Sequence, residues 1–298
     1  MLHKILLDTD IGDDIDDAIA LALGVKSSDV DFKGVITTYR NSRLRAKIAL
    51  SLLDELNRLD IPVAQGLDDP LKQSYFWFPF DKKDINGKPI IGHYEDYMDT
   101  FEVSKKSGID LMAETIRQNP NEISLVCIGP LTDIATLYKA YPKEYGMLKE
   151  IVIMGGRFDE NRAEWNIKCD PEAADIVFSS GQKIRLVPLD VTLQCVFSEE
   201  QIHRLGDCNS KNVRLTKMIN IWRSNTKNNK LPILHDPLAL SVVFSDFCNF
   251  EPMNIRIGLD GGERGCTIID NEKGYRIFVA LKVKSSEFTE YVCNSLCD

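Results

Sequence analysis

The feature that most constrains the fold is the alternation of short β-rich runs with longer helical patterns through the first two thirds of the chain. The β-rich runs span residues 4–8, 32–38, 61–66, 123–129, 150–156 and 183–189. Helical patterns follow most of them, at 16–23, 44–56, 110–117, 131–138 and 171–178. Strands that alternate with helices form βαβ units, and near-continuous Val, Ile and Leu is typical of strands buried on both faces. We therefore predict an α/β fold with an open, mostly parallel sheet flanked by helices.

The last third of the chain has a different pattern. Helical stretches at 199–205, 213–227 and 235–244 are followed by the strand-like runs "MNIRIGL" (253–259), "CTIID" (266–270) and "YRIFVALKV" (275–283), and by a final helix from about residue 287. Three strands joined by short connections favour a small antiparallel addition to the sheet. The chain contains no low-complexity linker and no internal repeat, so we expect residues 1–298 to form a single domain.

Composition excludes several classes of function. The 36 Lys and Arg against 45 Asp and Glu give a net charge of −9, which argues against nucleic acid as a partner. The eight cysteines form no Cys-x-x-Cys pair, so we expect reduced, mostly buried thiols rather than a zinc site. The first apolar run is too short for a signal peptide, and no apolar run reaches the ~18 residues of a membrane span. We expect a cytoplasmic protein with no membrane partner.

Six aspartates lie between Asp8 and Asp17, where the first strand meets the first helix. Helix capping and the helix dipole account for two or three of them, but not for Asp8 and Asp10 at the strand end as well. Hard cations such as Ca²⁺ and Mg²⁺ take several oxygen ligands, carboxylates foremost. Because ligands of parallel sheets bind beyond the carboxyl ends of the strands, the position also fits. The sequence therefore predicts a metal site here.

Two known metal patterns fit this stretch poorly. An EF-hand loop that begins at Asp8 would need Gly at its sixth position and Glu at its twelfth, and the chain has Asp13 and Ile19 there. A haloacid-dehalogenase-type phosphatase also begins with Asp-x-Asp after its first strand, but usually has Thr or Val where this chain has Gly12. A Mg²⁺-dependent phosphohydrolase with Asp8 as nucleophile remains an alternative.

The stretch "DTDIGDDIDDAIAL" (8–21) more closely resembles the first motif of the nucleoside hydrolases, the N-ribohydrolases of the inosine–uridine type. The resemblance continues in order over most of the chain. The further matching segments are "GVITT" (34–38), "IPVAQG" (61–66), "IGPLTDIA" (128–135), "IVIMGG" (151–156), "EWNIKCDPEAADIVF" (164–178), "LDVT" (189–192) and "LHDPLAL" (234–240). Ordered matches of this number are not expected by chance.

The resemblance implies hydrolysis of the N-glycosidic bond of a ribonucleoside, or a related ribosyl compound, through an oxocarbenium-like transition state. It implies one Ca²⁺ per subunit, held by the carboxylates of Asp10, Asp17 and Asp236 and by the backbone carbonyl of Thr132. Asp10 would also be the general base for a water held by the metal. Asp8 would be a nearby carboxylate that orients the ligands.

The same resemblance implies the contacts to the substrate. Asp16, Asn41, Glu164 and Asn166 would hold the ribose hydroxyls, and Met154 would line the ribose face.

The leaving base would be protonated by a histidine, which titrates near physiological pH. His235 is favoured because it immediately precedes Asp236 in a matching segment. His3 lies at the terminus, and His203 lies in a charged helical stretch and is expected at the surface. His93 lies in an irregular stretch that could enter the pocket.

The chain departs from the family pattern in the sugar-binding wall. The family usually has Val-x-Gly-Asn where this chain has "YRN" (39–41), so the register of Asn41 is open. The loop before residue 164 is short and offers only Asn161 as a weak substitute for an expected amide. Two extra residues around Asp13 and Asp14 allow either to take over the contact assigned to Asp16. These departures keep a third hypothesis open, a non-catalytic binder of nucleoside or ribose.

The aromatic segment "YFWFPF" (75–80) lies in a long loop, which is a common place for a lid. Its rings, or Trp222 on a late helix, could stack on a nucleobase. We favour ordinary packing or a subunit interface for this segment, since aromatic side chains are common in both. The resemblance implies a homodimer or homotetramer.

Overall fold

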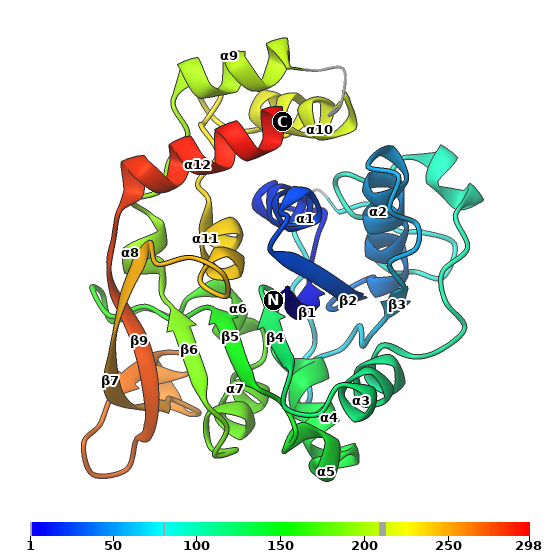
Figure 1. Ribbon diagram of the computed structural model, residues 1–298. Coiled ribbons are helices and arrows are strands. Elements are labelled where there is room, and N and C mark those ends of the chain that lie inside the picture. The colour runs from blue at the N-terminus through cyan, green and yellow to red at the C-terminus, as the bar shows by residue number, and fades with distance from the viewer. Residues whose placement is uncertain (1, 80, 209–212) are drawn as a thin grey trace.

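The computed structural model describes residues 2–79, 81–208 and 213–298. Its nine strands form one sheet in the order β3-β2-β1-β4-β5-β6-β9-β7-β8 (Figure 1). The strands are β1 (His3–Thr9), β2 (Val30–Thr37), β3 (Val63–Gln65), β4 (Ile123–Cys127), β5 (Glu150–Met154), β6 (Ile184–Val187), β7 (Cys248–Ile257), β8 (Thr267–Ile269) and β9 (Tyr275–Val283). The neighbouring strands in the run β3-β2-β1-β4-β5-β6-β9 all pair in parallel. This confirms the predicted open, mostly parallel sheet.

Helices cover both faces of the sheet (Figure 1). The described α-helices are α1 (Asp16–Lys26), α2 (Ser42–Glu55), α3 (Gly108–Gln118), α4 (Thr132–Ala140), α5 (Pro142–Tyr145), α6 (Trp165–Cys169), α7 (Pro171–Phe178), α8 (Leu189–Thr192), α9 (Glu199–Asp207), α10 (Val213–Asn225), α11 (His235–Ser241) and α12 (Ser285–Cys297). Short 3-10 turns are formed by Asp96–Thr100 and Gly261–Glu263. Within the described ranges, none of these helices has the length and apolar character needed to cross a bilayer.

The core consists of two apolar clusters, one on each face. Ile5 and Leu7 of β1 join the cluster that includes α1, α2 and α11, whereas Leu6 joins the cluster that includes α3, α4 and α7. This alternation follows from the two-residue period of a strand, and it explains why β1 is apolar at every one of these positions.

The C-terminal addition is antiparallel only in part. β7 pairs antiparallel with β8 and with β9, as predicted, but β9 pairs parallel with β6 and so extends the main sheet. β7 also begins at Cys248, five residues before the predicted start, and has a register shift between Asn249 and Phe250. The bulge and Pro252 interrupt the alternating pattern, which is why the sequence did not indicate this part of the strand.

The order of strands places a functional site at the carboxyl end of β1. The chain runs outward from β1 to β2 and β3 on one side, and from β4 to β5 and β6 on the other. The loops after β1 and β4 therefore leave the sheet on opposite faces and open a crevice between them. The loop of residues 10–15, which holds most of the aspartates, lies at this point.

Candidate active site and metal centre

A cavity of about 1090 Å³ opens at the carboxyl ends of the central strands. It is lined by the loop after β1, the segment 90–94, the ends of β4 and β5, and residues of α6, α10 and α11. The predicted site residues that line it are Asp10, Asp16, Asp17, Met154, Glu164, Asn166, His235 and Asp236. The cavity is large enough for a small-molecule ligand.

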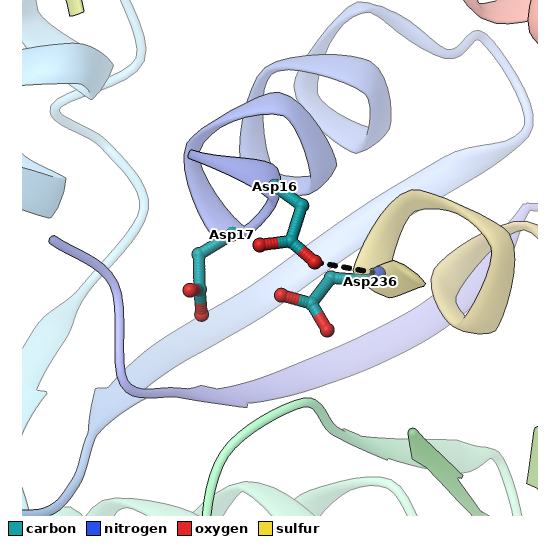
Figure 2. Close-up of side chains that lie close together, drawn as sticks. All are labelled: Asp16, Asp17 and Asp236. Atoms are coloured by element: carbon teal, nitrogen blue, oxygen red, sulfur yellow. Dashed lines mark hydrogen bonds between the residues drawn. The ribbon is translucent and has the colours of Figure 1, made fainter. Parts of the chain in front are cut away.

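Three carboxylates meet at one point of this cavity. Asp16 and Asp17 come from the first turn of α1 and Asp236 from the first turn of α11, and Figure 2 shows them converging from these two helices. One oxygen of each lies within 4.8 Å of the others, and all three residues are buried. The backbone N–H of Asp236 donates to Asp16 Oδ2 at 3.4 Å, drawn as the dashed line in Figure 2. Burial and the neighbouring aspartates raise the pKa of all three carboxyls well above the usual range.

Such a cluster needs a counter-charge, because buried carboxylates at this separation repel one another. The donor set consists of oxygen atoms only, which is the set preferred by hard divalent cations. The hydroxyl of Thr9, at the end of β1, donates to Asp17 Oδ1 at 2.5 Å and fixes the orientation of that carboxylate. Sequence reasoning did not single out Thr9, although a hydroxyl residue next to a ligand aspartate is a usable signal.

Asp10 lies beside this cluster but is half-buried, and it faces the cavity. Burial raises the pKa of its carboxyl to about 6, with the guanidinium of Arg45 acting in the opposite direction. Gly129, just after β4, is so close that a Cβ there would lie 2.9 Å from the Asp10 nitrogen. The backbone after β4 therefore packs directly against Asp10.

The loop between Asp10 and α1 is held by a fully buried arginine. Arg45 of α2 donates from Nη2 to Asp13 Oδ2 at 2.7 Å, from Nη1 to the Ile11 carbonyl at 3.0 Å, and also to the Asp10 carbonyl. Asp13 therefore has a framework partner, and Asp14 accepts from its neighbour's backbone N–H at 2.7 Å. Both residues line the cavity, but the carboxylate cluster contains Asp16 and neither of these two.

Asp8 does not reach the cavity. It lies within β1, fully buried, against the carboxyl group of Asp133, and burial together with that neighbour raises its pKa well above the usual range. Burial raises the pKa of Asp133 itself to about 7. A group enclosed in this way has no path to a phosphate ester. The position of Asp8 therefore does not fit the role of nucleophile that the phosphohydrolase alternative gives it.

Thr132 is also outside the cavity. Its hydroxyl donates to Asp170 Oδ2 at 2.7 Å, and its carbonyl accepts from the Thr136 hydroxyl at 2.9 Å within α4. The residue after β4 that lines the cavity is Ile128, four positions earlier. The backbone turns into α4 immediately after Leu131, and this turn carries the Thr132 carbonyl along the helix axis instead of into the cavity.

The predicted ribose-facing residues from the later strands do line the cavity. The Glu164 carboxylate accepts from the backbone N–H groups of Asn166, Gly156 and Ile167, at 2.9, 3.1 and 3.2 Å. Burial raises its pKa to about 7. Asn166 Nδ2 donates to the carbonyls of Ile128 (3.0 Å) and Met154 (3.2 Å), so it ties the ends of β4 and β5 together. Asn161 is exposed and is not part of the cavity lining.

Asn41 is a helix cap and not a cavity residue. Its Oδ1 accepts from the Leu44 N–H at 3.4 Å at the start of α2, and its Nδ2 donates to Asp84 and to the Pro89 carbonyl at 3.0 and 3.1 Å. The backbone takes positive φ at Tyr39 (69°) and Arg40 (65°), which turns the chain before Asn41 arrives. The structure therefore does not bring Asn41 into the cavity with the other residues predicted to contact ribose.

We expect Asn41→Ala to lower the free energy of unfolding by about 1 kcal/mol through the lost cap, and to leave kcat/KM for a ribonucleoside within about twofold. Ser107→Ala is the matched control. The Ser107 hydroxyl caps α3 by accepting from the Asp110 N–H at 3.1 Å, and Ser107 does not line the cavity. Denaturant unfolding and steady-state kinetics of both variants check this. A large loss of activity in Asn41→Ala, with none in Ser107→Ala, would support the predicted contact of Asn41 with ribose.

Two of the four histidines enter the cavity. His235 begins α11, and burial lowers its pKa to about 4. His93 lies on the segment that packs on the aspartate loop, through its N–H to the Gly12 carbonyl at 2.9 Å, and burial lowers its pKa to about 4 as well. Gly12 has φ of +125°, and a Cβ there would lie 2.5 Å from Ile91. His203 is exposed on α9, as predicted.

The aromatic segment 75–80 contributes Phe78 to the cavity wall. Our preferred interpretation, ordinary packing or a subunit interface, did not include this contact. Phe78 and Trp165 both line the cavity and stack at 5.6 Å and 20°. The guanidinium of Arg40 lies 4.7 Å from the centre of the Phe78 ring and pairs with Asp13 and Asp81. Trp222 of α10 lines the cavity too. Residue 80 of this segment lies outside the described residues.

Comparison with known proteins gives a consistent set of relatives. The model of the inosine-uridine preferring nucleoside hydrolase family matches residues 5–290. Uridine nucleosidase 1 of Arabidopsis thaliana is 30% identical over 280 residues, which cover 90% of this chain and 82% of the relative. The non-specific ribonucleoside hydrolase RihC of Escherichia coli O127:H6 is 31% identical over 312 residues, 99% of each chain.

Solved structures are similar over the same length. A plant nucleoside hydrolase, the PpNRh1 enzyme, has a TM-score of 0.87 at 26% identity and covers 100% of this chain and 99% of its own. A purine-preferring ribonucleoside hydrolase from Gardnerella vaginalis has a TM-score of 0.84 at 26% identity, with 99% and 98% covered. The likeness therefore includes the C-terminal strands and helices that complete the cavity.

Proposed function

This chain belongs to the inosine-uridine preferring nucleoside hydrolase family, and from that premise we propose that residues 1–298 act as one catalytic domain that hydrolyses the N-glycosidic bond of a ribonucleoside, or a related ribosyl compound, to free base and ribose. The observation that carries the proposal is the convergence of Asp16, Asp17 and Asp236 in the cavity at the carboxyl end of β1. Positive charge develops on the sugar during this reaction, and a carboxylate-lined cavity stabilises it. The names of the relatives cover uridine, purine and non-specific activities, so the proposal names no base.

Members of the family depend on a metal, and the carboxylate cluster fits one. We propose one Ca²⁺ per subunit, held by Asp10, Asp17 and Asp236, because all the donors are hard oxygen atoms. The carbonyl of Ile128 replaces that of Thr132 in this proposal, since Ile128 lines the cavity and Thr132 does not. Such a cation would make a water molecule easier to deprotonate. Asp8, within β1, orients these ligands without contacting the cation.

The residues of the chain divide the remaining work. Asp10 takes the proton of the attacking water, and its pKa of about 6 leaves it ionised near neutral pH. Asp16 and Asn166 hold ribose hydroxyls, as does Glu164, whose backbone N–H partners fix its carboxylate in place. Met154 covers the apolar face of the sugar, and His235 donates to the leaving base.

The test is release of reducing sugar from a panel of purine and pyrimidine ribonucleosides, with and without a Ca²⁺ chelator. We expect release that the chelator abolishes and that added Ca²⁺ restores, because removing the cation leaves the carboxylate cluster without its counter-charge. Phosphate esters serve as the control substrates. We expect no phosphate release from them, because Asp8 is enclosed against Asp133 and does not line the cavity.

Tight nucleoside binding without sugar release would favour the non-catalytic binder instead. We also propose, on the family resemblance, a homodimer or homotetramer that works in the cytoplasm. Size-exclusion chromatography with light scattering tests the assembly.

A further inference from the structure

The imidazole of His235 is held by one hydroxyl group. Thr192 Oγ1 lies 2.6 Å from His235 Nδ1. Across the described ranges 2–79, 81–208 and 213–298, this is the one hydrogen bond that the His235 side chain makes. Thr192 is fully buried at the end of α8. The partner of this histidine is therefore a neutral hydroxyl group.

The backbone fixes the two residues against each other. The segments on either side pair through an isolated antiparallel bridge between Val196 and Ile233. The Leu234 N–H donates to the Cys195 carbonyl at 2.8 Å, and the Phe197 N–H donates to the Pro232 carbonyl at 3.0 Å. These contacts hold the start of α11 beside the end of α8. The short distance from Thr192 to His235 thus results from rigid backbone pairing between two segments 43 residues apart.

The hydroxyl group of Thr192 has two possible acceptors within reach. Thr192 Oγ1 is 2.6 Å from His235 Nδ1 and 3.3 Å from the Leu189 carbonyl oxygen. A hydroxyl group has a single proton, and the shorter contact is the stronger one. When Thr192 donates to Nδ1, the neutral imidazole carries its own proton on Nε2. Since Nε2 lies on the other edge of the ring and His235 lines the cavity, this N–H is presented to the cavity.

We propose that Thr192 is a positioning residue that fixes the tautomer and orientation of His235, so that the Nε2–H group donates to the leaving base. The inference rests on the proposed function. Negative charge grows on the base as the glycosidic bond breaks, and a hydrogen bond aimed at that charge strengthens only in the transition state. The effect of Thr192 therefore falls on kcat and depends on how much help the leaving group needs.

The experiment compares Thr192→Val with Thr192→Ser on two substrates. Valine keeps the shape and removes the hydroxyl, whereas serine keeps the hydroxyl. We expect Thr192→Val to lower kcat for uridine about tenfold with KM within about twofold, as for loss of one interaction made in the transition state. Thr192→Ser should retain kcat within about threefold. With 4-nitrophenyl riboside, whose leaving group is stable without a proton, Thr192→Val should lose less than about threefold.

A second readout does not depend on turnover. The ¹⁵N shifts of the His235 ring distinguish the two neutral tautomers, and the chain has only four histidines to assign. We expect the Nε2–H tautomer in the wild type and in Thr192→Ser, and a mixture in Thr192→Val. Equal losses on both substrates, or an unchanged tautomer in Thr192→Val, would overturn the positioning role. Absence of sugar release in the wild type would instead overturn the proposed function, and the ring shifts would still decide the orientation.

Discussion

Replacing Asp236 with asparagine should lower ribonucleoside turnover by about 10³-fold or more and, at the same time, make the metal-free protein more stable. The loss of activity follows from removing one of the three carboxylates, those of Asp10, Asp17 and Asp236, that are proposed to hold the cation. A divalent cation contributes several kcal/mol to such a reaction, and ~10³-fold corresponds to about 4 kcal/mol.

The gain in stability follows from the same geometry. Burial, Asp16, Asp17 and Asp10 all raise the pKa of Asp236, so its charged form is disfavoured in the folded state. Asparagine has nearly the same shape and no charge, and it removes repulsion worth about 1 kcal/mol or more without a cation. Ca²⁺ should raise the melting temperature of the wild type and have little effect on Asp236→Asn, since ligand binding to the folded state alone stabilises it.

Thermal unfolding with and without Ca²⁺, together with sugar release, measures all three effects. Asp246→Asn is a matched control, because Asp246 is on the connection that follows α11 and its side chain is 96% exposed. We expect this control to behave as the wild type does in each assay. A variant Asp236→Asn that keeps its Ca²⁺ response and activity would place the metal elsewhere.

The βα alternation predicted most of the fold because burial on both faces makes each parallel strand apolar at successive positions. β1 and β4 are visible for this reason, and the site follows from them, since the sheet order reverses between these two strands. Residues in the loop directly after β1 and in the first turns of α1 and α11 were therefore placed well. Asp16, Asp17, Asp236 and His235 are of this kind.

The misplaced residues depend on backbone geometry that a pattern of letters does not encode. Asn41 was expected in the cavity, but positive φ at the non-glycine residues Tyr39 and Arg40 rotates it into a capping position. Thr132 was expected to point its carbonyl at the metal, but α4 begins at that residue and takes the carbonyl into the helix. A shift of one residue in a tight turn is enough to exchange a ligand for a cap.

The most important framework residue of the site was missed for another reason. Arg45 lies 35 residues from Asp10 in sequence, in a helix whose other residues look ordinary. An arginine in a helical pattern is usually on a solvated face, and only the packing of α2 against the aspartate loop buries it. The sequence contains no local signal for such a contact.

We expect Arg45→Leu to lower the free energy of unfolding by about 3–5 kcal/mol, a large part of the stability of a typical domain. Arg45 is fully buried, and its guanidinium donates to Asp13 and to the carbonyls of Tyr39 (2.9 Å), Ile11 (3.0 Å) and Asp10. Leucine fills part of the volume but satisfies none of these acceptors. Buried carbonyls left without donors cost about 1–3 kcal/mol each when no water reaches them.

Arg58→Leu is the control for loss of an arginine near the same helix. Arg58 pairs with Asp60 at 2.8 Å, but both side chains are about a third or more exposed, so this change should cost less than ~1 kcal/mol. Denaturant unfolding of both variants, with the slope of the transition compared, separates a loss of stability from a change in the unfolded state. A cost below ~1 kcal/mol for Arg45→Leu would mean that water satisfies the loop carbonyls.

Adding Asp13→Asn to Arg45→Leu tells which part of the contact matters. If the cost came mainly from an unpaired Asp13 carboxylate, the second change would recover most of the stability. We expect only partial recovery. In Arg45→Leu alone the Asp13 carboxylate keeps its ion pair with Arg40 at 2.9 Å, and in both variants the three carbonyls lack their donor. Activity should fall with stability in both variants, since the loop that Arg45 holds also carries Asp10. The arginine therefore connects the stability of the aspartate loop to the position of the proposed general base.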